Sequence, residues 1–305
     1  MKIANALLAA ALVLTTAAAA AHDSWLAAGP VAATEGAAWL ALGTGNQFPT
    51  QESGIDAPFV VRRGCRGASP ATPSVKPVKP ATDAAALVST LVSTLVPTLV
   101  PTPLPTLVPT PLPTPLPTLA LKALRNLPTA LLLQLPRGAV TCWVQLTPFD
   151  VEVAPDKVPV YLKEIQATPE VRATWAAMQA RGLPWRERYT KYARIEFGGK
   201  GPRAALPLGM DVRLDSPRAP IRAGDELGFQ VLRDGAPIAD LPVELVNDVN
   251  PLGIWRKTDA EGRVRVMVPL AGRWLLRSVD LRVSRKTADE WESWFVTLAF
   301  QVAAR

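Results

Sequence analysis

Short apolar runs separated by turn residues fill the last hundred residues of the chain. In the segment 263–269, one face carries Val264, Val266 and Val268, and the other face carries Arg263, Arg265 and Met267. This alternation is typical of a strand with one buried side. About seven strand candidates occupy 205–305, which indicates a mainly β C-terminal domain of 205–305. We expect an antiparallel β-sandwich of the immunoglobulin-like or transthyretin-like kind.

Two turns punctuate this region most clearly. The turn 258–262, with Asp259 and Gly262, lies between two strand candidates, and Ala271-Gly272 lies between the next two. Asp and Gly suit turn positions because they tolerate backbone angles that other residues avoid. We expect these turns to join neighbouring strands as hairpins.

The upstream segments combine strands with a small helical insert. Strand-like runs in 22–65 complete the same sandwich or build a second sheet, and 139–204 begins with another strand. A helix is predicted after Thr168. Thr168 is the N-cap residue, Pro169 takes the first helical position, and Gly182 ends the helix. A shorter helix is expected over 160–165.

The segment 185–192, WRERYTKY, interleaves basic and aromatic residues. We expect a helix with buried aromatic and solvated basic side chains. The alternative is a pocket for an anionic ligand.

A low-complexity insertion rich in Pro, Thr and Leu occupies 66–138. Within it, 89–120 repeats four-residue units such as PTLV and PTPL. Proline lacks the amide donor and restricts the preceding residue, so neither a helix nor a sheet ladder is expected. We predict a disordered surface loop. Two roles stay open for it: a passive insertion, or a spacer or docking track for an envelope partner.

The N-terminus predicts export from the cytoplasm. Residues 1–21 have a basic start at Lys2, an apolar centre and a run of alanines, as in a secretory signal peptide cleaved after Ala21. The net charge of +7 becomes +6 without Lys2. In an exported protein this charge favours anionic envelope surfaces over nucleic acid. We expect a periplasmic protein with no transmembrane segment after removal of the signal.

Two cysteines, Cys65 and Cys142, agree with an oxidising compartment. A disulfide between them would hold together the ends of the insertion. The alternative interpretation is a pair of free thiols that bind a metal.

The candidate metal ligands are His22 and Asp23. Cleavage after Ala21 would leave His22 with a free α-amine and a ring nitrogen that chelate Ni(II) or Cu(II), with the Asp23 carboxylate nearby. A partner or water must complete such a shell. The alternative is a terminal His22 whose ring hydrogen-bonds into the first strand.

No catalytic residues are expected. Ser24 and Ser293 lack convincing His and acid partners, because His22 is the only histidine of the chain. Phosphate-binding glycine loops are also absent from the sequence. We therefore expect a protein that is not an enzyme.

Several short motifs lie outside the insertion: HDSWL at 22–26, GTG at 43–45 followed by Phe48-Pro49, RERYTKYA at 186–193, TDAEG at 258–262, GRW at 272–274 and WES at 291–293. In these motifs the chain resembles a family of exported bacterial proteins of unknown function that are associated with nickel uptake. The resemblance implies a periplasmic accessory binding protein of envelope transport that handles a transition metal such as nickel. The alternative is a structural or interaction protein that docks an envelope receptor or transporter.

Deletion of 89–120 tests the passive role of the repeat. We expect the folded yield and the melting temperature of the mature protein to stay unchanged, because long surface loops add little closure entropy. Circular dichroism during heating measures this. A collapse of the folded yield would contradict the passive role.

Overall fold

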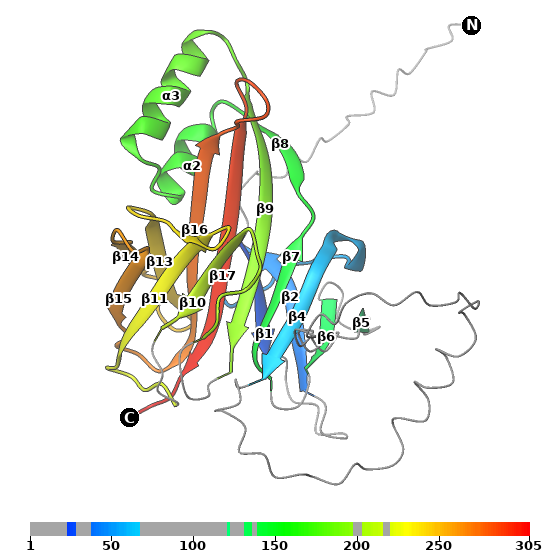
Figure 1. The fold of residues 1–305 in the computed structure, drawn as a ribbon, viewed down its shortest axis with the longest axis vertical. Coiled ribbons are helices and arrows are strands. Elements are labelled where there is room, and N and C mark those ends of the chain that lie inside the picture. The colour runs from blue at the N-terminus through cyan, green and yellow to red at the C-terminus, as the bar shows by residue number, and fades with distance from the viewer. Residues whose placement is uncertain are drawn as a thin grey trace, which may run out of the picture. The chain divides into compact units, whose positions relative to one another are not determined.

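Three β-sheets and two α-helices form the part of the chain that the structure describes (Figure 1). This computed structural model describes residues 23–28, 38–67, 121–122, 131–135, 139–197, 203–215 and 220–305. For 38–39, 121–122, 131–135 and 139–140 it describes the backbone alone. The predicted signal peptide, His22 and the repeat 89–120 lie outside the described residues.

An eight-stranded sheet is the centre of the fold. Its order is β14 (Ile254–Lys257), β13 (Pro242–Asn247), β16 (Gly272–Val283), β17 (Trp291–Val302), β9 (Trp185–Glu196), β7 (Ala139–Leu146) and β4 (Val60–Gly67), and β8 (Phe149–Val153) also pairs with β9. Only β17 and β9 run parallel among its described neighbours. The strands β9, β16 and β17 are each twelve residues long.

A four-stranded sheet covers one face of the large sheet, over the part that lies lower in Figure 1. It consists of β10 (Met210–Leu214), β11 (Glu226–Arg233), β12 (Ala236–Pro237) and β15 (Arg263–Met267). Phe229 and Val266 from this sheet join Leu276 and Leu298 of the large sheet in one core. The exposed and buried positions of β15 alternate as predicted from the sequence. The mainly β, antiparallel sandwich is therefore confirmed.

A second covering sheet lies on the lower part of the opposite face. It contains β1 (Asp23–Ala28), β2 (Ala38–Gly45), β3 (Ser53–Gly54), β5 (Leu121–Lys122) and β6 (Leu131–Leu135), and the 3-10 helix η1 (Ala57–Phe59) precedes β4. Trp25 and Leu42 pack against Val144 and Ile195 of the large sheet. The N-terminal strands thus build a second sheet, and β6 extends it into the stretch that the sequence assigned to the insertion.

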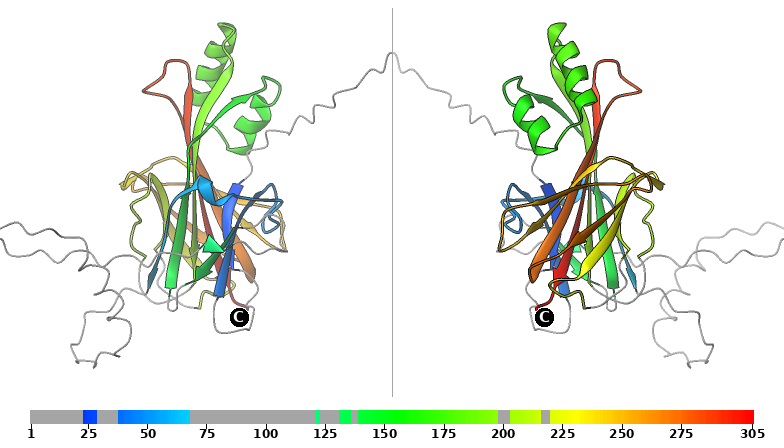
Figure 2. Two further views of the ribbon diagram at one scale, coloured as in Figure 1. Left: turned by 90° about the vertical axis from the view of Figure 1, so that its right-hand side faces the viewer. Right: turned by 90° about the vertical axis from the view of Figure 1, so that its left-hand side faces the viewer.

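The helices α2 (Val158–Glu164) and α3 (Pro169–Ala180) cover the upper part of this same face, at one end of the long strands (Figure 2). Trp175 and Met178 of α3 pack with Trp185 and Trp291 of the large sheet. Thr168 caps α3 by accepting a hydrogen bond from the Val171 amide, so this predicted helix start is confirmed.

The predicted helix over 185–192 is wrong, because these residues form the first part of β9. Trp185 and Glu187 are buried under the helices, whereas Arg186 and Arg188 point to the other face and are exposed. The segment has a period of two, which suits a strand covered on one side. Arg186 and Arg188 are solvated and Trp185 and Tyr192 are buried, as expected but on a strand, whereas Tyr189 and Lys191 are half-buried.

Both predicted hairpin turns instead carry the chain from one sheet to the other. The turn 258–262 joins β14 of the large sheet to β15 of the four-stranded sheet, and Ala271-Gly272 leads from β15 back to β16. The turn chemistry is as expected, since Gly262 has a positive φ of 68°. Pairing differs because each amphipathic strand buries its apolar face in the core between the two sheets.

The predicted disulfide between Cys65 and Cys142 is present. The two residues lie directly opposite each other on β4 and β7, with Cα atoms 4.0 Å apart, and both are buried. The free-thiol interpretation is therefore wrong.

Replacement of both Cys65 and Cys142 by alanine should lower the free energy of unfolding by about 4 kcal/mol, because the bond closes a long loop. The two residues are 77 positions apart. Urea unfolding of the variant measures the loss, and wild-type protein under reducing conditions is the matched control. An unchanged midpoint in both samples would contradict this estimate.

Candidate functional site

A cavity of about 310 Å³ opens on the face of the large sheet that carries the helices and the five-stranded sheet. We call it the central cavity. Its charged, polar and aromatic lining includes Asp23, Asn46, Glu164, Trp255, Arg277 and Phe295. These residues come from the ends of β1, β2 and α2 and from the floor provided by the sheet, so distant parts of the chain converge here.

The length of the central strands explains why a cavity forms at this place. A twelve-residue strand is about 40 Å long at roughly 3.3 Å per residue. On β16, Leu275 packs with the five-stranded sheet and Leu281 packs with the helices. Arg277 falls on the same face between them, because alternate residues of a strand share a face. The two covering layers leave this middle height open.

Arg277 is held between two carboxylates on the cavity floor. Its Nη1 donates to Asp23, and its Nε donates to Glu244 at 2.6 Å. Burial by itself lowers the pKa of the Arg277 guanidinium, but Asp23 and Glu244 together raise it by more, so the pKa lies above its usual value. The Arg277 side chain is still 33% exposed, whereas those of Asp23 and Glu244 are 10% and 8% exposed. The two carboxylates thus orient the Arg277 guanidinium, and part of the Arg277 side chain stays exposed to the cavity.

Gly253, in the loop before β14, leaves room for the Glu244 side chain. A Cβ atom at Gly253 would lie 1.8 Å from Glu244 Oε1, which is far inside van der Waals contact. A side chain at position 253 would therefore displace the Glu244 carboxylate from its present place.

Lys191 lies on the same face of β9, beside the cavity. Its ammonium stands 5.3 Å from the ring centroid of Tyr189 and 5.7 Å from that of Phe295. Burial lowers the pKa of Lys191, and the nearby Asp23 carboxylate opposes this change. The aromatic floor of the cavity therefore already accommodates one cationic group.

Glu187 is a second buried charged group, sealed beneath the helices. Tyr161 donates to its Oε1 at 2.9 Å, Trp185 donates to its Oε2 at 2.8 Å, and Ser293 also donates to Oε1. Burial raises the pKa of the Glu187 carboxyl above its ordinary value of 4.5, against the effect of these three hydrogen bonds. Burial and the Glu187 charge raise the pKa of Tyr161 as well.

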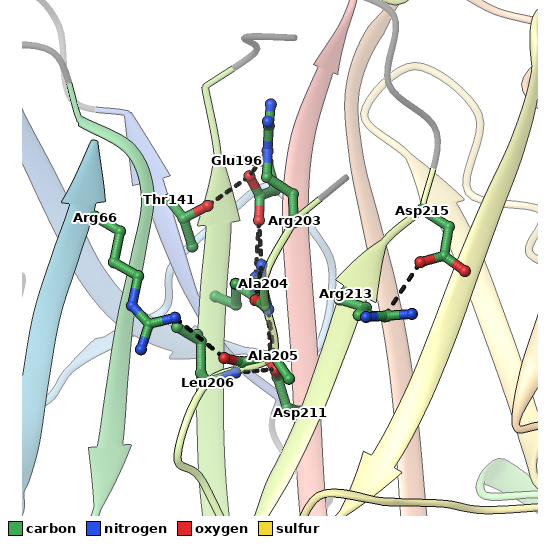
Figure 3. A network of polar contacts seen from close by, with 11 residues as sticks. Arg66, Thr141, Glu196, Arg203, Ala204, Ala205, Leu206, Asp211, Arg213 and Asp215 are labelled. Atoms are coloured by element: carbon green, nitrogen blue, oxygen red, sulfur yellow. Dashed lines mark hydrogen bonds and ion pairs between the residues drawn. The ribbon is translucent and has the colours of Figure 1, made fainter. Parts of the chain in front are cut away.

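A third polar cluster lies on the opposite face of β9 (Figure 3). Arg194 pairs with Asp211 at 2.9 Å and with Glu196 at 2.7 Å, and Arg203 pairs with Glu196 at 2.7 Å. Thr141 donates to Glu196, and the Leu206 amide donates to Asp211. Two cations balance two anions, so this cluster has no charge to offer a ligand. It joins β9, β10 and residues 203–206.

The predicted metal ligands are only partly described. Asp23 lies at the central cavity and is paired with Arg277, and its neighbour His22 lies outside the described residues. No group of three or more His, Cys, Asp or Glu side chains within the described ranges is arranged to hold a metal ion. Ser293 donates its hydroxyl to Glu187.

Sequence reasoning missed Glu187, Lys191, Glu244 and Arg277. A signal was present, because each is flanked two positions away by apolar or aromatic residues on the same face of its strand. Glu244, for example, interrupts the apolar run of β13, in which every residue is buried. Charged residues at such positions need a partner or a function.

The comparison with family models identifies part of the chain. Residues 152–279 match a model described as a domain of unknown function, DUF4198. The chain contains a DUF4198 domain. The matched segment extends from β8 to β16 and includes Glu164, Lys191, Glu244 and Arg277, while Asp23 and Phe295 lie beyond it. Searches of curated proteins and of solved structures found no match to the chain.

Replacement of Glu187 by glutamine should change how stability depends on pH. Because the folded-state pKa of Glu187 is raised, its protonated form stabilises the fold below about pH 4.5, and this contribution is lost as the pH rises through the folded-state pKa. Glutamine cannot ionise, so the variant should lack this fall in unfolding free energy.

Urea unfolding between pH 4 and pH 8 measures the difference. Glu152→Gln is the matched control, since Glu152 is an exposed glutamate on the neighbouring β8, paired with Arg186. Parallel pH profiles for wild type and Glu187→Gln would show that Glu187 does not titrate in this way.

Proposed function

We propose that this DUF4198-containing protein is a non-enzymatic periplasmic binding protein that serves as an accessory to transport through the cell envelope. The observation that carries the proposal is the central cavity with Arg277 open at its floor. Its volume of about 310 Å³ lies at the small end of the range for ligand sites. Apolar and aromatic walls with a few convergent charged groups are typical of such sites.

An extracytoplasmic location is supported by two features. The Cys65–Cys142 disulfide is consistent with an oxidising compartment, and the N-terminus resembles a secretory signal. Within the described ranges, no helix has the length and apolar character to cross a membrane.

A non-enzymatic role is favoured by the chemistry of the polar clusters. Glu187 is sealed beneath the helices, and the Arg194 cluster is balanced in charge. His22 is the single histidine of the sequence, so no imidazole other than that of His22 could activate Ser24 or Ser293 as a nucleophile.

In its finer form, the proposal assigns a transition-metal ion, Ni(II) or Cu(II), as the cargo. The support is the resemblance to proteins associated with nickel uptake and the place of Asp23 at the cavity, directly after His22. Asp23 already pairs with Arg277. Such an ion would therefore bring ligands of its own or take further ones from His22.

The alternative function, docking to an envelope receptor or transporter, is favoured by one observation. Val249 and Leu252, in the loop between β13 and β14, are 71% and 78% exposed. Exposed apolar side chains of this kind can contact a partner. A photo-crosslinker at Leu252 that captures one envelope transport component, with capture lost in Val249→Asp, would favour docking.

Native mass spectrometry of the untagged protein purified from a periplasm tests the binding function. We expect a retained small molecule, or a retained metal after addition of Ni(II) or Cu(II). Ile165→Trp should abolish retention, because Ile165 lines the cavity and the larger ring fills it. Val249→Trp, which also replaces a β-branched apolar residue by tryptophan but in an exposed loop, is the matched control. A wild-type protein that retains neither would contradict the proposal.

A further inference from the structure

We infer that the central cavity binds an organic cation, a small molecule with a protonated or quaternary amine on an apolar body. This inference rests on the proposed binding function, and it assigns an organic cation as the ligand of the central cavity in place of the transition-metal ion. It combines three properties of the cavity: the balance of its charges, the aromatic surfaces on its floor and the position of one carboxylate at its rim.

The charges around the cavity have an acidic excess. Arg277 is matched by two carboxylates, Asp23 and Glu244, and Glu164 adds a third at the rim. Lys191 beside the cavity is a further cation, and burial disfavours its charged form. An anionic ligand would increase the excess negative charge, whereas a cation reduces it.

Glu164 is the group best placed to meet an incoming cation. It is exposed at the end of α2, it lines the cavity, and it makes no ion pair with any residue in the described part of the chain. Asp23 and Glu244, in contrast, are engaged by Arg277. The ligand's ammonium group can therefore pair with Glu164 without breaking an existing ion pair.

The aromatic lining favours the same charge. Phe295 lines the cavity, and the Lys191 ammonium already lies 5.7 Å from the centroid of its ring. Trp255, half-buried on β14, presents a second aromatic surface to the cavity. Indole is the side chain whose face attracts cations most strongly. With Ile165 and Val279, these rings also provide an apolar surface for the body of the ligand.

Isothermal titration calorimetry of the mature full-length protein tests the inference with three probes of similar shape: phenethylamine, benzyltrimethylammonium and 3-phenylpropionate. Both cations should bind, and the anion should bind at least about tenfold more weakly, because it adds to the negative charge. Binding of the quaternary probe supports recognition of charge by the rings, since this group donates no N–H hydrogen bond.

Two variants locate the site. Glu164→Gln should weaken both cations about fivefold, as for loss of one exposed ion pair. Trp255→Ala should weaken them about five- to thirtyfold through loss of the cation–π contact. Glu226→Gln is the matched control: Glu226 is an exposed glutamate on β11 of the four-stranded sheet, where it pairs with Arg265. This control should bind as wild type does.

The outcomes separate the inference from the binding function. Equal or tighter binding of 3-phenylpropionate, or cation binding that both cavity variants leave unchanged, would overturn the organic cation and leave a binding protein. If no probe binds, the identity of the molecule retained from the periplasm in native mass spectrometry tests the inference instead. A retained organic cation supports the inference. A retained anion, neutral compound or bare metal overturns it. If nothing is retained either, both the inference and the binding function fail.

Discussion

Burial of both faces of three long strands is the constraint on which the rest of this structure depends. Each of β9, β16 and β17 runs for about 40 Å and presents side chains to two sides of the sheet. The four-stranded sheet covers part of one face, and the five-stranded sheet and the helices share the other. The central cavity exists because these last two layers cover different heights of the same strands.

The large sheet buries charge in three different ways. The Arg194 cluster balances two cations against two anions away from solvent, so removal of one partner would leave an uncompensated charge at a cost of about 3–5 kcal/mol. Glu187 pairs with no cation in the described part of the chain and depends on three hydrogen-bond donors. Arg277 is paired twice and yet open to the cavity. Only this third arrangement combines unequal charge with access, which is why the proposed ligand is assigned there.

Local sequence patterns predicted the correct element where one buried face or one capping residue determines the local structure. The alternation of Val264, Val266 and Val268 predicted β15, and the Thr168 cap predicted the start of α3. The segment 185–192 failed because its aromatic and basic residues were assigned to a helix, although their period of two indicates a strand. Towards the C-terminal end of β9 both faces are buried. The alternation of buried and exposed residues that identifies a strand therefore disappears after Thr190.

By itself, the sequence determined the mainly β class, the helix start at Thr168, the turn at Gly262 and a disulfide between the only two cysteines. Each of these follows from local preference or from a unique pairing. The tertiary structure decided which strands pair, that the turn at Gly262 crosses between sheets, and that Asp23 meets Arg277 across 254 positions of the chain. Such contacts depend on which faces are buried together, and no local pattern encodes that choice.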